Sequence, residues 1–315
     1  MKLELSQVHT ELQQVARRMP GLTFTKKNLW LMHVLTRLLP PPRVPQQILV
    51  ENVFIPAAED RTKVRLRIYK PKSLPADVPV LLWFHGGGYI MGNPEQDDGC
   101  CIQYVRELGI MVVSVDYRHA PKYPFPAALW DGCTALRWVV AHSQDLGVDA
   151  KRIAIGGASA GGGLAASLVQ YAQDRLETKP VFQLLVYPML DDRTVLRPEI
   201  GDHDHIAWNQ SSNRFGWESY LGTRCGLENA PEYSVPARRK EMAGLPQAWI
   251  GVGTLDLFYD EDLAYAQKLM EGGVQCEVYT VPGAFHGFDV LDAQLPVVQD
   301  FRKSQVLALK KCLSL

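Results

Sequence analysis

One serine of this chain stands in a setting that could make it a nucleophile. Ser159 lies at the centre of the sequence GGASAGGG, which covers residues 156–163. Glycine costs about 0.5–1 kcal/mol per position in a helix or strand, so a stretch this rich in glycine is poorly explained by stability. A serine hydroxyl can attack a carbonyl carbon when an imidazole takes its proton and a carboxylate orients that imidazole.

The residues around Ser159 place it in a turn between a strand and a helix. The apolar run RIAIG precedes the serine, and a segment rich in Ala and Leu follows it. A sharp turn of this kind lifts the hydroxyl above the sheet edge, and small neighbours avoid clashes in it. The start of the helix also favours negative charge nearby. We therefore interpret Gly157–Gly161 as a nucleophile elbow; the alternative is a glycine-rich packing turn.

The imidazole and the carboxylate are expected downstream of the serine, in the order acid and then histidine. His286 follows the apolar run CEVYTV, and Asp256 follows the run AWIGVG. Both should lie at the carboxyl edge of a parallel sheet, where active sites of such sheets are found. Asp260 is the nearest alternative acid, but it stands where a helix is predicted to begin.

A second glycine-rich loop could supply hydrogen-bond donors to an oxyanion. The sequence HGGGY at 85–89 follows the apolar run VLLWF. Consecutive glycines leave backbone N–H groups uncovered and able to turn toward a ligand. Losing one such donor typically costs about 2.7–4 kcal/mol of transition-state stabilisation. The alternative is an ordinary loop at a strand end, but its pairing with the serine turn predicts an oxyanion hole, with the amide of Ala160 as a further donor.

Metal sites are not expected. Residues 202–205 read DHDH, but alternating polar residues in a loop are typical of a solvated surface, and a third set of ligands is missing. Cys100 and Cys101 are adjacent without a second close pair, which argues against zinc. The six cysteines are expected to be free thiols.

The elements that must position these residues alternate along the chain. Residues 48–55 and 63–70 show the polar–apolar alternation of a half-exposed antiparallel pair. Continuous apolar runs lie at 80–84, 110–115, 152–156, 182–187, 248–253 and 276–281. Such runs are typical of parallel strands that are buried on both faces. Helical segments are predicted at about 96–108, 126–142, 162–176, 260–271 and 294–312. We expect an α/β fold with a mostly parallel, eight-stranded sheet and helices on both faces.

A helical cap is expected over this sheet. It would combine the N-terminal part, with helices predicted at 3–19 and 27–39, and an insertion that interrupts the strand–helix rhythm. The predicted division is 1–45 for the N-terminal part of the cap, 46–190 for the first part of the core, 191–235 for the cap insertion and 236–315 for the second part of the core. Five cap residues either line a substrate pocket or pack in the cap's own core: Trp30, Leu31, Trp208, Phe215 and Trp217.

Taken together, the motifs resemble the hormone-sensitive-lipase-like branch of the α/β-hydrolase esterases. The matching segments are HGGGY at 85–89, VDYRHAPKYPFPAA at 115–128, GASAGGG at 157–163, YPML at 187–190, the loop with Asp256, and HGF at 286–288. The resemblance implies a catalytic triad of Ser159, Asp256 and His286, with oxyanion amides from Gly86, Gly87 and Ala160. It implies carboxylic esters with short or medium acyl chains as substrates and no cofactor, and it allows a homodimer through the last strand.

Two residues depart from the family pattern. Ala158 stands where the family usually has an acid before the serine, which removes a local hydrogen-bonding group. Leu257 stands where a proline usually follows the acid, which removes rigidity. Neither change touches an atom of the triad, so activity is expected to survive.

The triad alone leaves two other functions open. An amidase, deacetylase or peptidase could use the same three residues. A ligand receptor on the hydrolase fold is a further alternative, but receptors similar to this family lack the histidine, which is retained here as His286.

Composition excludes some partners. The formal net charge is −1, so a nucleic-acid partner or binding to an anionic membrane surface is not expected. The N-terminus lacks the apolar region of a secretory signal, and the apolar stretch 29–39 is too short to span a bilayer. We expect a cytoplasmic protein whose partner is a small-molecule ester.

Overall fold

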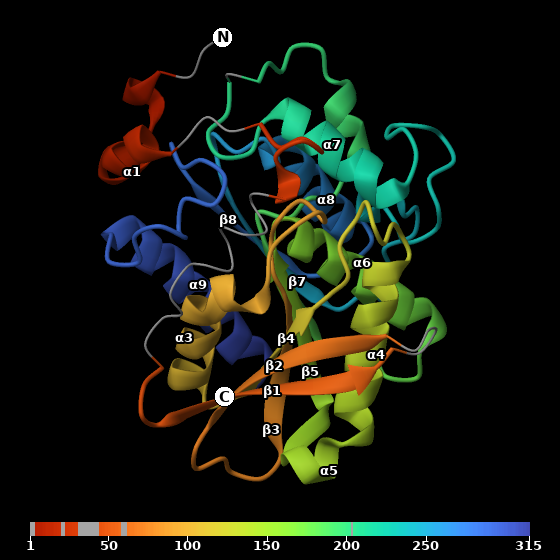
Figure 1. The fold of residues 1–315 in the computed structure, drawn as a ribbon. Helices are drawn as coiled ribbons and strands as arrows, with labels where there is room; N and C mark the ends of the chain where they lie inside the picture. The colour runs from red at the N-terminus through yellow and green to blue at the C-terminus, as the bar shows by residue number, and fades with distance from the viewer. Residues whose placement is uncertain (1–3, 20–22, 31–43, 58–61, 203) are drawn as a thin grey trace.

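The structure is a computed structural model of the chain that describes residues 4–19, 23–30, 44–57, 62–202 and 204–315. Its eight strands form a single sheet with the order β1-β2-β4-β3-β5-β6-β7-β8 (Figure 1). The strands are β1 (Ile48–Pro56), β2 (Lys63–Pro71), β3 (Val78–Phe84), β4 (Met111–Asp116), β5 (Val148–Ala158), β6 (Phe182–Val186), β7 (Gln247–Gly253) and β8 (Cys276–Val281). β2 pairs antiparallel with β1 and β4, and every other pair is parallel. The predicted mostly parallel, eight-stranded sheet is confirmed.

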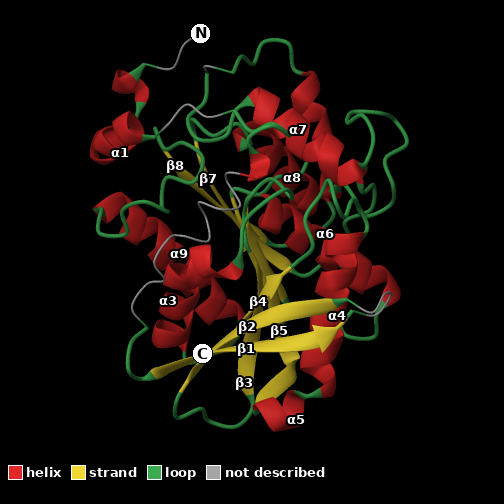
Figure 2. Ribbon diagram, in the orientation of Figure 1, coloured by secondary structure: helices red, strands yellow, loops and turns green. Residues whose placement is uncertain are grey.

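Helices cover both faces of the sheet (Figure 2). Helices α3 (Asp98–Leu108) and α9 (Pro296–Cys312) pack into one apolar layer. Helices α4 (Ala127–Ala141), α6 (Ala160–Arg175) and α8 (Tyr259–Glu271) pack into the other. The central strands are therefore buried on both faces, as β3 shows with all its residues buried. The short helix α5 (Ser143–Leu146) precedes β5.

The register of the strands brings their carboxyl ends level. Phe84 at the end of β3 lies beside Gly157 of β5, and Ala158 lies beside Val186 of β6. Val186 in turn lies beside Gly251 near the end of β7. The loops that follow these strands thus emerge side by side, which is where the residues with predicted chemistry stand.

The single N-terminal helix predicted at 3–19 is wrong. The segment forms two 3-10 turns, Leu5–Gln7 and Thr10–Leu12, followed by α1 (Gln13–Arg18). The N–H of His9 donates to the carbonyl oxygen of Gly283 at 2.9 Å, so this part of the backbone bonds to the loop after β8. Of the helix predicted at 27–39, residues 31–39 lie outside the described residues.

The insertion between β6 and β7 contains a helix of its own, α7 (Gln210–Leu221), together with the short turns Asp192–Leu196 and Pro236–Arg238. Asn209 caps α7, because its side chain accepts from the N–H of Ser212 at 2.9 Å. The division into core and cap stays a prediction, as does the homodimer through β8.

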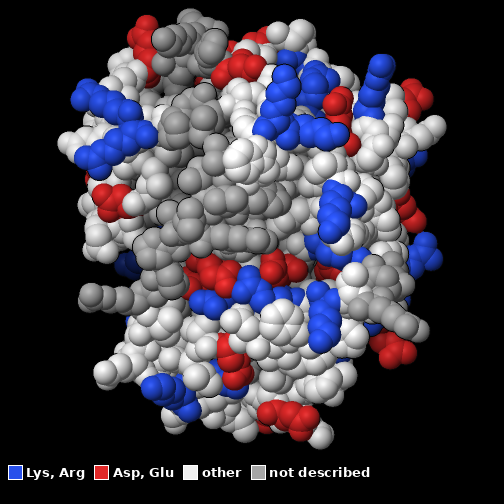
Figure 3. Space-filling view, viewed as in Figure 1, with Lys and Arg blue, Asp and Glu red and all other residues white. Residues whose placement is uncertain are grey.

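Acidic and basic side chains are intermixed over the face in Figure 3. The helices that the structure describes include none with the length and apolarity to cross a bilayer. All six cysteines are free thiols, as expected.

Candidate active site

Ser159 sits in a strained turn between β5 and α6. Its φ of 56° and ψ of −123° lie in a region that non-glycine residues rarely occupy, at a cost of about 1–3 kcal/mol. Three backbone hydrogen bonds hold this conformation. The N–H of Ser159 donates to Val186 at 2.9 Å, and its carbonyl accepts from Gly163 at 3.0 Å and Met189 at 2.9 Å. The turn expected for a nucleophile elbow is therefore present.

Glycines around Ser159 allow the helix to begin directly against the sheet. A Cβ on Gly161 would lie 2.1 Å from the carbonyl oxygen of Phe84. A Cβ on Gly157 would lie 2.4 Å from the backbone of Gly161. Backbone cannot move aside as a flexible side chain can, so these positions require glycine. This requirement explains why residues 156–163 are so rich in glycine.

His286 joins Ser159 to Asp256. Its Nε2 lies 2.9 Å from Oγ of Ser159, and its Nδ1 lies 2.8 Å from Oδ2 of Asp256. The carboxylate is held in turn by the N–H of Phe258, which donates to Oδ1 at 2.9 Å. An ionised carboxylate only accepts, so the proton of the neutral imidazole is on Nδ1 and Nε2 can accept from the serine hydroxyl. All three side chains are buried.

Asp260, the alternative acid, lies elsewhere. It is within the first turn of α8, where it pairs with Arg197 at 2.6 Å on the surface. The loop that carries Asp256 lacks the usual proline, and here Leu257 and Phe258 are buried in the core instead.

The glycine loop after β3 lies against the serine turn. A Cβ on Gly86 would lie 3.4 Å from Cβ of Ser159. In the described part of the chain, no backbone carbonyl accepts a hydrogen bond from the N–H groups of Gly86, Gly87 and Gly88. Ala160 begins α6, so its N–H is one of the unpaired donors of a helix's first turn. The loop and the helix start therefore present uncovered donors beside the serine.

His85 helps to fix this loop. Burial lowers the pKa of His85 to about 4, so its imidazole is neutral at pH 7. Its Nδ1 lies 2.8 Å from the carbonyl oxygen of Gly86, and this oxygen can only accept, so Nδ1 carries the proton. The ring stacks on Tyr117 with centroids 4.4 Å apart, and the Tyr117 hydroxyl donates to the His85 carbonyl at 2.9 Å.

The predicted cap residues have different surroundings. Trp208 is buried and covers the glycine loop, because a Cβ on Gly88 would lie 2.2 Å from its ring. Trp217 is also buried and packs on Tyr89 with ring centroids 5.4 Å apart. Phe215 is half-buried against the core, and Trp30 is 67% exposed. Leu31 lies outside the described residues.

His205 is a functional candidate that sequence reasoning assigned to a solvated surface. It is half-buried, and its Nδ1 is buried without a hydrogen-bond partner among the described residues. Burial lowers its pKa, and it is near enough to Asp256 and His286 to interact with their charges. The prediction that this loop is a solvated surface is therefore wrong for His205. His203 lies outside the described residues, and the residues that the structure does describe contain no cluster of three or more potential metal ligands.

The chain is similar to known hydrolases. A profile of the alpha/beta hydrolase fold family matches residues 81–290. The chain is 36% identical over 247 residues to the esterase LipI of Mycobacterium tuberculosis, across 78% of this chain and 77% of that protein. It is 31% identical to an ethyl acetate hydrolase of Pseudomonas putida, across 71% of this chain and 70% of that protein.

Solved structures are similar over nearly the whole chain. A bacterial heroin esterase superposes with a TM-score of 0.88 at 31% identity, covering 98% of this chain and 99% of that one. The esterase LipW of Mycobacterium marinum superposes with a TM-score of 0.86 at 34% identity, covering 99% and 98%. This chain belongs to the alpha/beta hydrolase fold family, in its hormone-sensitive-lipase-like branch.

Proposed function

We propose that this protein is a serine carboxylesterase that hydrolyses short- to medium-chain carboxylic esters through an acyl-enzyme. The observation that carries the proposal is the contact of one buried imidazole with both Ser159 and Asp256. The relatives named as esterases support the reaction class. The relative named as an ethyl acetate hydrolase supports a preference for short esters.

In the proposed reaction, His286 first acts as a base. Its Nε2 takes the hydroxyl proton of Ser159 while Oγ forms a bond to the ester carbonyl carbon, and Asp256 stabilises the imidazolium. The carbonyl oxygen becomes negative and is stabilised by N–H donors of Gly86, Gly87 and Ala160. The N–H of Gly88 is a further candidate donor, which sequence reasoning did not single out.

The leaving group then departs. The bond between the carbonyl carbon and the alkoxy oxygen breaks, and His286 gives its proton to that oxygen, which releases the alcohol and leaves an acyl-serine. Water then loses a proton to His286 and attacks the acyl carbon. The bond between that carbon and Oγ of Ser159 breaks, the acid leaves, and His286 returns the proton to Oγ.

The test is a panel of p-nitrophenyl esters from acetate to palmitate, measured with the wild-type protein and with Ser159→Ala. We expect the highest kcat/KM on short and medium chains and a loss of about 10⁴-fold or more in the variant. A matched pair, p-nitrophenyl butyrate and butyryl p-nitroanilide, separates an esterase from an amidase. Labelling of Ser159 by a fluorophosphonate separates both from a receptor. Ester turnover that survives in Ser159→Ala would overturn the proposal.

A further inference from the structure

We propose that Gln96 is a positioning residue for the oxyanion loop: its side-chain amide holds the peptide between Gly86 and Gly87, so that the N–H of Gly87 faces the reacting oxygen. The inference rests on the proposed function, because it concerns a donor of that reaction. It adds a residue outside the motifs that define the triad and the glycine loop.

The geometry of one peptide carries the argument. Nε2 of Gln96 lies 3.3 Å from the carbonyl oxygen of Gly86. The carbonyl of Gly86 and the N–H of Gly87 belong to the same planar trans peptide, so they point in opposite directions. A side chain that fixes the carbonyl therefore fixes the direction of the N–H. Gly87 has a φ of 125°, and glycine backbone rotates with little steric resistance. The loop therefore needs a contact that fixes the orientation of this peptide.

The amide of Gln96 is itself oriented. Its Oε1 accepts from the N–H of Asn93 at 3.3 Å, and its own backbone N–H donates to Oδ1 of Asn93 at 3.2 Å. These reciprocal bonds form a capping box at the start of the 3-10 turn Pro94–Asp97. With Oε1 engaged on Asn93, the NH₂ end of the amide is the part directed at Gly86.

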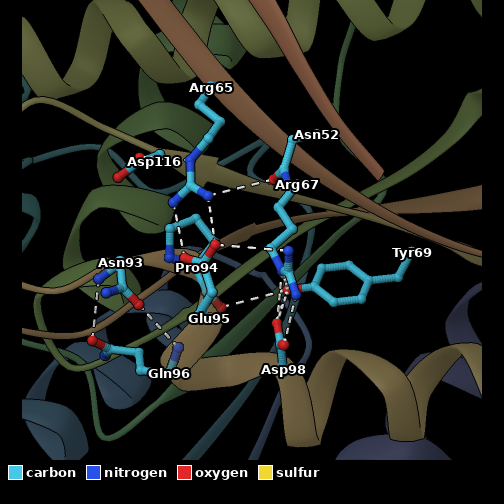
Figure 4. A network of polar contacts seen from close by, with 10 residues as sticks. All are labelled: Asn52, Arg65, Arg67, Tyr69, Asn93, Pro94, Glu95, Gln96, Asp98 and Asp116. Carbon is cyan, nitrogen blue, oxygen red and sulfur yellow. Dashed lines mark hydrogen bonds and ion pairs between the residues drawn. The ribbon is translucent and has the colours of Figure 1, made fainter. Parts of the chain in front are cut away.

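The turn that carries Gln96 is anchored to the sheet (Figure 4). Arg65 of β2 donates to Glu95 at 2.8 Å, and Arg67 of β2 makes two bonds of 2.8 Å to Asp98. Charge-assisted, two-pronged bonds of this kind restrict geometry strongly. The position of Gln96 is therefore set by β2.

Two donors from different segments hold the same carbonyl. Nδ1 of His85 contacts the Gly86 oxygen at 2.8 Å, and Gln96 supplies the second contact. Gly92 makes this approach possible, since a Cβ there would lie 2.5 Å from the same oxygen. Rotating the peptide would break both hydrogen bonds. Without the Gln96 contact, only the hydrogen bond from His85 fixes this carbonyl, so we expect a partial loss of oxyanion stabilisation.

The experiment compares Gln96→Met, which lacks the donor, with Gln96→Glu, which keeps an acceptor for Asn93 but loses the donor when ionised. Gln103→Met and Gln103→Glu, the same changes at a half-buried position of α3, are the controls. Each protein is assayed on p-nitrophenyl butyrate and on the matching thionoester. A thionoester carries sulfur in place of the carbonyl oxygen, so its reaction depends less on oxyanion donors.

We expect kcat on the ester to fall about three- to tenfold in both Gln96 variants, with KM changed less than about twofold. The rate on the thionoester should fall much less, so the ratio of ester to thionoester rates should fall. The Gln103 variants should keep the wild-type ratio. A general loss of folded or active protein would lower both rates together and leave the ratio unchanged.

An unchanged ratio in the Gln96 variants would overturn this inference. Gln96 is exposed, so both variants are expected to fold, and thermal unfolding checks this. If the Met variant fails to fold, the Glu variant carries the comparison. An ester rate that does not depend on Ser159 would instead overturn the proposed function, so the two failures are distinct.

Discussion

Oδ2 of Asp256 lies 2.8 Å from Nδ1 of His286. Asp256 is on the loop after β7, and His286 is on the loop after the neighbouring strand β8. This contact decides which nitrogen of the imidazole carries the proton and thus whether Nε2 can accept from Ser159. Asp256→Asn should therefore lower kcat for ester hydrolysis by about 10⁴-fold with little effect on folding.

Asp260→Asn is the matched control, because the same chemical change falls on an exposed residue of α8. We expect it to retain wild-type kcat. Steady-state kinetics and thermal unfolding of both variants are the measurements. A loss of less than about tenfold in Asp256→Asn would contradict the proposed role of the carboxylate.

Two helical glycines allow a second matched test. A Cβ on Gly161 would collide with the carbonyl oxygens of Phe84 and His85, at 2.1 Å and 2.4 Å, whereas a Cβ on Gly99 would meet nothing within 4 Å. Gly99→Ala should stabilise the protein by up to about 1 kcal/mol, because alanine favours helix. Gly161→Ala should destabilise it by more than about 4 kcal/mol or prevent folding. Urea denaturation of the two variants measures the difference, and equal effects would show that the turn at Ser159 can relax.

The core of the sheet could be predicted from the sequence because its strands are continuous apolar runs buried on both faces. The run at 276–281 matches β8 in both bounds, and the run at 80–84 falls inside β3. Since parallel strands end at one edge, knowing the strands was enough to expect Ser159, Asp256 and His286 together.

Positions that depend on contacts between distant segments could not be predicted this way. The spacing of Val8, Leu12 and Val15 indicates a buried face correctly, but not that His9 bonds to Gly283 and interrupts the helix. The surface assignment of His205 was wrong because a polar sequence does not show which side chains of a loop become buried.

Two missed elements did carry a local signal. The sequence NPEQ at 93–96 has an N-cap asparagine, a proline at the first position and a glutamine at the third, which is typical of a helix start. Asn209 and Gly222 bracket α7 in the same manner, with Gly222 in the left-handed conformation that ends helices.

Asp262 gives a prediction on pH dependence. It is fully buried in α8, and neither carboxylate oxygen has a hydrogen-bond partner among the described residues. Burial, with the nearby carboxylates of Glu261 and Asp256, raises its pKa well above the ordinary value. The folded protein therefore keeps a proton that the unfolded chain loses above about pH 4, so the stability from this group is full below that pH and declines as pH rises.

Asp262→Asn removes the titration at nearly constant size. The free energy of unfolding of the variant should exceed that of the wild type by about 1–3 kcal/mol at pH 8, with a smaller difference at pH 5. Urea denaturation at both pH values measures this. Parallel pH profiles for the two proteins would show that Asp262 is not a buried, neutral acid.

The same substitution should affect stability very differently at two tryptophans. Trp208 is buried against the glycine loop and lies 5.4 Å from Phe24 between ring centroids, whereas Trp30 is 67% exposed. Trp208→Ala should lower the free energy of unfolding by about 3–5 kcal/mol, because it leaves a cavity. Trp30→Ala should change it by less than about 0.5 kcal/mol. Similar losses in both variants, measured by urea denaturation, would contradict this assignment.

The backbone bonds that hold Ser159 come from Val186, Gly163 and Met189, and α7 contributes none of them. Exchanging the half-buried Phe215 of α7 should consequently leave the backbone around Ser159 in place. We therefore expect that α7 can be redesigned while the backbone that presents the nucleophile keeps its conformation.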